Sequence, residues 1–128
     1  MTLVQLDDSI TIPAPADDHC ILRNFNNVEA GVTIVQAWLT VKRFDSDLDP
    51  GLFQKDINLV DNPGVGHIVA DGTSGTITLR FDILPADSLL LQTGAKQFDI
   101  QVKTATGKIH TQNAGTIRAK KPEITKAS

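Results

Sequence analysis

The sequence contains a single cysteine, Cys20, and no tyrosine among its 128 residues. One thiol cannot form a disulfide within the chain, and it cannot supply a cysteine cage for a metal ion. Positive charge is also scarce, because 12 Lys and Arg stand against 15 Asp and Glu, which gives a formal net charge of −3. The composition therefore predicts no nucleic-acid partner and no binding to an anionic membrane.

Long apolar runs are lacking as well. No stretch of the sequence approaches the roughly 18 consecutive apolar residues of a membrane-spanning helix, and residues 1–8 lack the basic and apolar regions of a signal peptide. We therefore expect a soluble protein without an export signal. A chain of 128 residues accommodates one ordinary domain that needs no disulfide or metal to hold its core. We assign this domain to residues 1–119 and expect the polar residues 120–128 to form a flexible C-terminal tail.

What the sequence does contain is a series of short runs rich in Val, Ile, Thr and Phe, separated by clusters of Gly, Pro, Asn and Asp. The clearest runs are residues 76–83, 97–103 and 37–44, in which apolar residues recur at every second position. In the first of them the apolar positions are Ile77, Leu79, Phe81 and Ile83. A period of two predicts strands with one buried face and one exposed face.

Weaker strand patterns fill the rest of the domain. They are predicted at residues 9–12, 19–25, 52–60, 67–70, 108–111 and 115–119. A short helix is expected near residues 85–93, because Pro85 and Gly94 bracket a leucine-rich segment. Roughly seven to nine short strands with one short helix indicate an all-β fold, namely an antiparallel two-sheet immunoglobulin-like β-sandwich. A small closed barrel remains the alternative.

An ordered series of segments within this pattern resembles a known family. The series comprises the strand end at 39–42, the acidic loop at 45–51, and the segments at 52–57, 75–79, 85–88, 98–102 and 115–117. In this order the segments resemble the immunoglobulin-like domains of tailed-phage and prophage structural proteins. They are similar in particular to the N-terminal domain of the upper baseplate protein of lactococcal phages, and the resemblance covers residues 9–119.

The resemblance implies a non-catalytic virion component of the tail or baseplate that docks on other tail or baseplate proteins. It also implies a homo-oligomer, assembly in the cytoplasm of a bacterial host, and no cofactor. Alternation along residues 37–44 indicates where docking could occur, because it turns Trp38 and Phe44 away from the side of Leu39 and Val41. Tryptophan is enriched in cores as well as at interaction hot spots, so ordinary packing of Trp38 under the helix or a loop remains the alternative.

A second class of function is a stand-alone carbohydrate- or receptor-binding β-sandwich. Such a module needs an exposed aromatic platform. One Trp, five Phe and no Tyr provide few residues from which to build it. The sequence therefore favours the virion component over this alternative.

Catalytic residues are difficult to assemble from the sequence. His19 and Cys20 are adjacent, so on a strand their side chains point to opposite faces and the imidazole cannot activate the thiol. We expect Cys20 to be a small buried apolar residue. The other histidines, His67 and His110, are distant in the sequence, and a three-histidine metal site would require all three to meet. We therefore expect that the protein is not an enzyme.

One acidic stretch has the spacing of a metal-binding loop. Asp45, Asp47 and Asp49 stand at the first, third and fifth positions of a frame that ends at Asp56, a spacing at which carboxylates converge on calcium. However, the sixth position is Pro50, where the sharp turn of a calcium loop requires glycine. A solvated acidic hairpin loop is therefore the better-supported interpretation, and we expect no metal.

Overall fold

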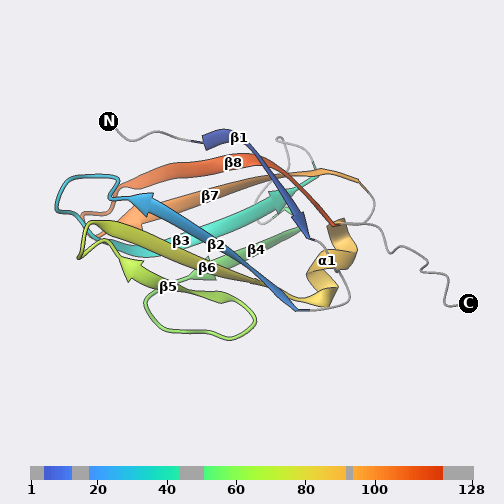
Figure 1. Cartoon of the computed structure of the whole chain (residues 1–128), viewed down its shortest axis with the longest axis horizontal. Helices are drawn as coiled ribbons and strands as arrows, with labels where there is room; N and C mark the ends of the chain where they lie inside the picture. Colours follow the sequence, from blue (N-terminus) through green and yellow to red (C-terminus); the bar gives the residue numbers. More distant parts are fainter. Residues whose placement is uncertain (1–4, 13–17, 44–50, 92–93, 120–128) are drawn as a thin grey trace, which may run out of the picture.

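The computed structural model describes residues 5–12, 18–43, 51–91 and 94–119 (Figure 1). The strands in these ranges are β1 (Gln5–Ile12), β2 (His19–Asn26), β3 (Ile34–Lys42), β4 (Phe53–Ile57), β5 (Gly66–Asp71), β6 (Thr76–Ile83), β7 (Lys96–Thr104) and β8 (Ile109–Ala119). One helix, α1, spans Pro85–Leu91. The predicted all-β fold with a short helix near residues 85–93 is confirmed. The predicted tail at 120–128 lies outside the described residues.

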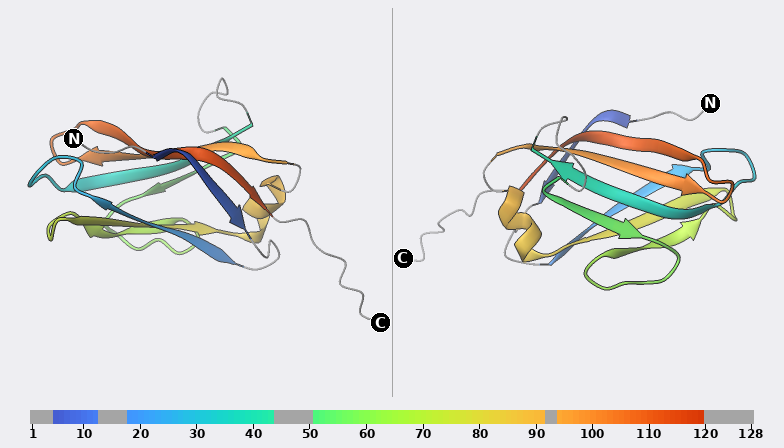
Figure 2. Two further views of the ribbon diagram at one scale, coloured as in Figure 1. Left: turned by 45° about the horizontal axis from the view of Figure 1, so that its top comes forward. Right: turned by 180° about the vertical axis from the view of Figure 1, so that it is seen from behind.

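The strands form two sheets stacked face to face, which the left view of Figure 2 shows as two layers. The larger sheet has the order β1-β8-β7-β3-β4, and the smaller sheet has the order β2-β6-β5. In an immunoglobulin-like sandwich the smaller sheet corresponds to strands B, E and D, and β4, β3, β7 and β8 correspond to C′, C, F and G. The predicted two-sheet sandwich is therefore confirmed, and the alternative of a closed barrel is wrong.

One pair of neighbouring strands departs from the antiparallel pattern that the sequence predicted. β1 runs parallel to β8, with Ser9 opposite Thr116 and Ile12 opposite Ala119. The other neighbouring pairs of the two sheets are antiparallel. Alternation could not reveal the difference, because a period of two fixes the face that a side chain takes and not the direction of the neighbouring strand.

The period-two runs line the space between the two sheets. Along β6, the apolar residues at every second position are fully buried, as predicted: Ile77, Leu79, Phe81 and Ile83. The same holds, with exposed fractions of 4% or less, for the inward positions of β3 and β7: Ala37, Leu39, Val41, Phe98, Ile100 and Val102. The side chains between them lie on the outer faces of the sandwich, and any interaction surface of the sheets must be built from those.

Helix α1 lies at one end of the sandwich (Figure 1) and is attached to it by a buried ion pair. Asp87 in the first turn of α1 accepts a hydrogen bond of 2.9 Å from the backbone N–H of Leu84, which caps the helix. The same carboxylate oxygen lies 2.7 Å from Nζ of Lys55 on β4. Lys55 also donates to the Gly64 carbonyl at 3.0 Å and is only 7% exposed. The pair therefore links α1 to the larger sheet. In the described part of the chain, no helix is long and apolar enough to cross a membrane.

The start of β5 requires a glycine. Gly66 has φ of 143°, a backbone conformation that side chains rarely adopt. A Cβ at this position would collide with the carbonyl oxygen of Arg80 on β6. Gly66 thus allows β5 to approach β6 closely where the chain returns from the loop that follows β4.

Candidate functional site: the outer face of the larger sheet

Trp38 lies on the outer face of the larger sheet, as its alternation with buried residues predicted. Its neighbours in sequence, Ala37 and Leu39, are fully buried between the sheets, so the indole points the other way. Across the sheet, Trp38 stands opposite Asp56 of β4 on one side and Gln101 of β7 on the other. The side chain is half-buried by these neighbours and keeps part of its surface exposed to solvent.

The side chains around Trp38 are polar and hydrogen-bonded to one another. Gln36 Nε2 donates to Asp56 Oδ1 at 2.7 Å, and Gln54 Nε2 donates to Thr40 Oγ1 at 2.8 Å. Gln101 Nε2 reaches Thr111 Oγ1 at 3.3 Å. The first two contacts join β3 to β4, and the third joins β7 to β8. We call this surface the Trp38 face, and it consists of Gln36, Trp38, Thr40, Gln54, Asp56, Gln101 and Thr111.

Hydrogen bonds between strands restrict the side chains of this face. A hydrogen-bonded glutamine has already lost side-chain freedom, so a partner that covers it does not have to order it. The amides and hydroxyls also form a polar surround for the one large aromatic ring. At the edge of the face, Thr40, Lys42, Gln97, Phe98 and Asp99 line a shallow hollow of about 60 Å³. The Trp38 face thus presents one large aromatic ring among hydrogen-bonded polar side chains, with a shallow hollow beside it.

Helix α1 does not pack over Trp38. The helix packs at the end of the sandwich, against β8, whereas Trp38 lies within β3 (Figures 1 and 2). Of the alternative that Trp38 packs under the helix or a loop, the helix part is therefore wrong, whereas the loop at 44–50 lies outside the described residues. The second predicted interface residue, Phe44, lies outside the described residues.

Of the four residues of the candidate calcium loop, the structure describes only Asp56. Asp45, Asp47 and Asp49 lie outside the described residues. Asp56 belongs to strand β4, where its carboxylate accepts the hydrogen bond from Gln36 on the Trp38 face. Among the described residues, no group of three or more His, Cys, Asp or Glu side chains could hold a metal ion.

Addition of millimolar calcium is expected to leave the melting temperature of the protein unchanged. A ligand that binds only the folded state raises stability with the logarithm of its concentration above the Kd, so a calcium site would show as a shift that keeps growing with concentration. Differential scanning fluorimetry with calcium, and with magnesium as the control, makes the measurement. A rise with calcium alone would restore the loop at 45–56 as a metal site.

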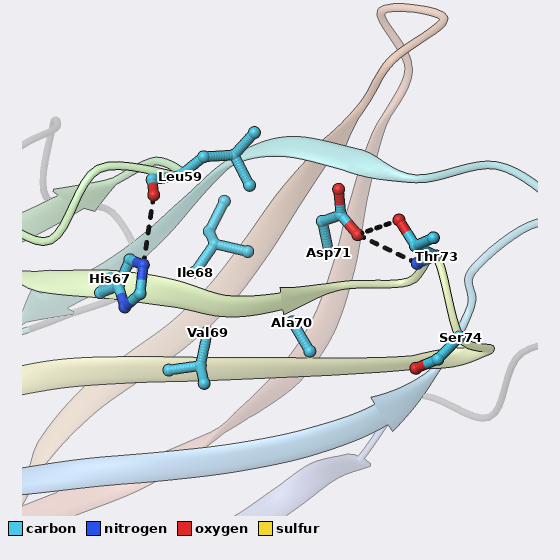
Figure 3. A pocket seen from close by; sticks show the side chains of 8 residues that line it. All are labelled: Leu59, His67, Ile68, Val69, Ala70, Asp71, Thr73 and Ser74. Atoms are coloured by element: carbon cyan, nitrogen blue, oxygen red, sulfur yellow. Dashed lines mark hydrogen bonds between the residues drawn. The ribbon is translucent and has the colours of Figure 1, made fainter.

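A second hollow, of about 380 Å³, runs beside β5 and is shown in Figure 3. His67 Nε2 lies 3.2 Å from the carbonyl oxygen of Leu59. Asp71 accepts hydrogen bonds from the hydroxyl of Thr73, at 2.6 Å, and from its backbone N–H, at 3.0 Å. These bonds hold the pKa of the Asp71 carboxyl below its usual value. The hollow has no Phe or Trp in its lining, so it offers a sugar no aromatic platform.

Cys20 is exposed on β2, which corrects the expectation that it is a buried apolar residue. It pairs with Asp82 on the outer side of the smaller sheet, whereas its neighbour His19 pairs with the inward residue Ile83. The predicted separation of His19 and Cys20 onto opposite faces is thus confirmed. Asp82 is already engaged by Arg80 at 3.0 Å and by the Gly64 N–H at 2.9 Å. The Asp82 carboxylate opposite Cys20 is therefore held by two other groups.

The three histidines are also placed apart. His19, His67 and His110 lie on β2, β5 and β8. His110 Nε2 lies 3.2 Å from Glu29 Oε1, and His67 is held by the Leu59 carbonyl. The three histidines form no common metal site, and His67 and His110 each make a local contact.

Arg80 occupies the centre of the outer face of the smaller sheet. Its guanidinium binds Asp82 on the same strand and Asp61 in the loop before β5. The hydrogen bond from Arg80 holds the pKa of the Asp61 carboxyl below its usual value. The smaller sheet therefore carries a paired charge cluster at its centre, together with the exposed apolar side chains of Leu22 on β2 and Val69 on β5.

The polar members of the Trp38 face could not be identified from the sequence. Asp56, Gln101 and Thr111 come from strands whose register relative to β3 is known only from the structure. Trp38 itself was found from local alternation alone. No model of a known protein family matches this chain, and no curated protein matches it either.

Proposed function

We propose that this chain is a non-catalytic structural module of a phage or prophage tail or baseplate, which docks on other virion subunits through the Trp38 face. The observation that carries the proposal is the position of Trp38, a half-buried indole among mutually hydrogen-bonded polar side chains on a sheet face. An aromatic anchor surrounded by a polar rim is the arrangement found at interaction hot spots.

Two features support the two parts of this proposal. The resemblance across residues 9–119 supports the virion context, including assembly in the bacterial cytoplasm. The β-sandwich supports the docking role, because strand pairing holds the outer side chains in fixed positions. Among the described acids, Asp82 beside Cys20 is bound by Arg80 and the Gly64 N–H, and Asp71 near His67 is bound by Thr73.

The virion role has a direct test. Particles are purified from an induced lysogen of the source bacterium and analysed by mass spectrometry. We expect this chain in the particles, in a fixed ratio to tail proteins. Intact particles that lack it would overturn the virion assignment, whereas genomic flanks with tail and baseplate genes would agree with it.

Substitution of Trp38 with alanine is expected to abolish incorporation into particles while leaving the domain folded. Truncation of a hot-spot aromatic costs about 2–4 kcal/mol of binding, which is roughly a 30-fold or greater loss of affinity. Because the indole is on an outer face, the expected loss of folding stability is smaller, below about 2 kcal/mol. Circular dichroism and thermal melting report the fold, and quantitative mass spectrometry of particles reports incorporation.

Leu22→Ala is the matched control. Leu22 lies on β2 in the smaller sheet and is 54% exposed, so its truncation removes apolar surface from the opposite side of the sandwich. The control is expected to be incorporated normally, and Trp38→Phe is expected to retain part of the function. If Trp38→Ala unfolds the domain, or if it is incorporated like the control, Trp38 is not the docking anchor.

A further inference from the structure

Exposed apolar side chains lie at the hollow of about 380 Å³ beside β5. Leu59 and Val69, which are 51% and 52% exposed, both line the hollow (Figure 3). Val60, which follows Leu59 in the chain, is 70% exposed. Apolar side chains that gather at a concave surface mark a place where another molecule binds.

The backbone of β5 is open at the same place. β5 is an edge strand of the smaller sheet and has β6 as its neighbour there. The loop before β5 covers the start of its free edge, where the Ile68 N–H donates to the Asn58 carbonyl at 2.8 Å. Farther along, in the described part of the chain, residues 69–71 have no backbone hydrogen bonds other than those of the ladder with β6. An extended chain can add to such an edge as a further strand.

Asp71 places a negative charge at one end of the hollow. One oxygen of its carboxylate, Oδ1, accepts both hydrogen bonds from Thr73. The other oxygen, Oδ2, makes no hydrogen bond or ion pair with another of the described residues. The bonds from Thr73 lower the pKa of the carboxyl, so it stays ionised at neutral pH. Oδ2 is therefore available to a lysine or arginine of another molecule.

The turn that follows Asp71 is fixed by a second contact. Asn27 Nδ2, from the connection between β2 and β3, donates to the Gly72 carbonyl at 2.8 Å. Together with the two bonds from Thr73, this contact holds the carboxylate in place. A partner that pairs with Asp71 therefore does not have to order it.

We propose that the hollow binds an extended peptide segment of a partner protein, in which a lysine or arginine lies among apolar residues. The segment lies along residues 69–71 of β5, and its cation pairs with Oδ2 of Asp71. Figure 3 shows Val69 and Asp71 pointing to opposite sides of β5. Side chains also alternate along the added strand, so the immediate neighbours of the cation cover Val69 and the next residues cover Leu59. The inference goes beyond the proposed virion role and does not rest on it.

Titration with peptides, followed by NMR, tests the proposal. The probes are capped pentapeptides with a central Lys or Arg and with Val, Leu or Thr at the four flanking positions. They are added at up to millimolar concentration to ¹⁵N-labelled protein. We expect the amide resonances of Leu59 and of residues 69–73 to shift. Matched peptides with a central Glu are expected to bind at least about fivefold more weakly, because attraction to Asp71 becomes repulsion.

Two variants connect this preference to Asp71. Asp71→Asn keeps an acceptor for Thr73 but removes the charge, so it is expected to bind the Lys and Glu peptides equally. Asp18→Asn is the matched control, because it removes the same charge from an exposed residue next to β2, which β6 separates from β5. The control is expected to keep the preference of the parent protein.

Three results would overturn the proposal. The first is that no peptide with a central Lys or Arg shifts the resonances of residues 69–73. The second is that the parent protein binds the Glu peptides as tightly as the Lys peptides. The third is that the same resonances shift when the protein is concentrated without peptide, which would assign this edge to a second copy of the chain.

Discussion

Replacement of Asp87 with alanine is expected to destabilise the folded protein by about 3 kcal/mol or more. The substitution removes the carboxylate that lies 2.7 Å from Lys55 Nζ, while the side chain of Lys55 remains only 9% exposed. The Lys55 ammonium then keeps its hydrogen bond to the Gly64 carbonyl. It has lost its counter-ion, however, in a site with little access to water. The N-terminal cap of α1 at Leu84 is lost as well, which adds about 1 kcal/mol. Denaturation by urea measures the change.

Three further variants distinguish the stability contributed by the ion pair from the stability contributed by the helix cap. Asp87→Asn keeps an acceptor for the Leu84 N–H but removes the charge, so it is expected to lose the ion-pair contribution alone. Lys55→Met/Asp87→Asn removes both charges, and it is expected to recover most of that loss, because a buried pair can be replaced by apolar groups at little cost. Lys55→Met alone should cost less than Asp87→Ala, since Asp87 is the more exposed partner. Full stability of Asp87→Ala would show that the pair does not hold α1.

The Lys55–Asp87 contact shows that local sequence patterns do not identify which residues from distant elements form a pair. Both residues were inside predicted elements, a strand at 52–60 and a helix near 85–93, but lysine is almost never fully buried without a partner. Its partner is contributed by an element far along the chain, and the sequence contains no signal for which acid that is. The core stripe on β6 was predictable for the opposite reason. A period of two within one strand specifies its buried face without reference to any other strand.

The same distinction applies to β8 and to the candidate site. The sequence predicted separate strands at 108–111 and 115–119, whereas β8 is continuous from Ile109 to Ala119. The intervening Gln112 and Asn113 look like loop residues, yet they are 2% exposed within a strand whose register shifts near them. A β-bulge absorbs the extra residue and hides the strand from a period-two analysis. Trp38 was found because its own strand is regular, but its partners Asp56 and Gln101 depend on pairing between strands.

Replacement of Phe81 with alanine is expected to lower the free energy of unfolding by about 3–5 kcal/mol. Phe81 is fully buried on β6, the central strand of the smaller sheet, and it stands opposite Ile21 of β2 and Gly66 of β5. The glycine contributes no side chain that could move into the space left by the ring. The cavity should therefore remain largely open, which places the cost toward the upper end of the range.

For a domain of this size the loss corresponds to a fall in melting temperature of more than about 10 °C, measured by calorimetry. Because a domain is stable by only about 5–15 kcal/mol, this loss removes a large part of the stability, and nearly all of it for a domain at the lower end of that range. Phe81→Ala should then be missing from particles through unfolding, whereas Trp38→Ala should be missing although it is folded. Leu89→Ala, on the exposed side of α1 at 63% exposure, serves as the surface control and should melt within a few degrees of the parent. A Phe81→Ala protein that melts like this control would contradict the shared core between the two sheets. The outer position of Trp38 was inferred from that core, so this inference would then fail as well.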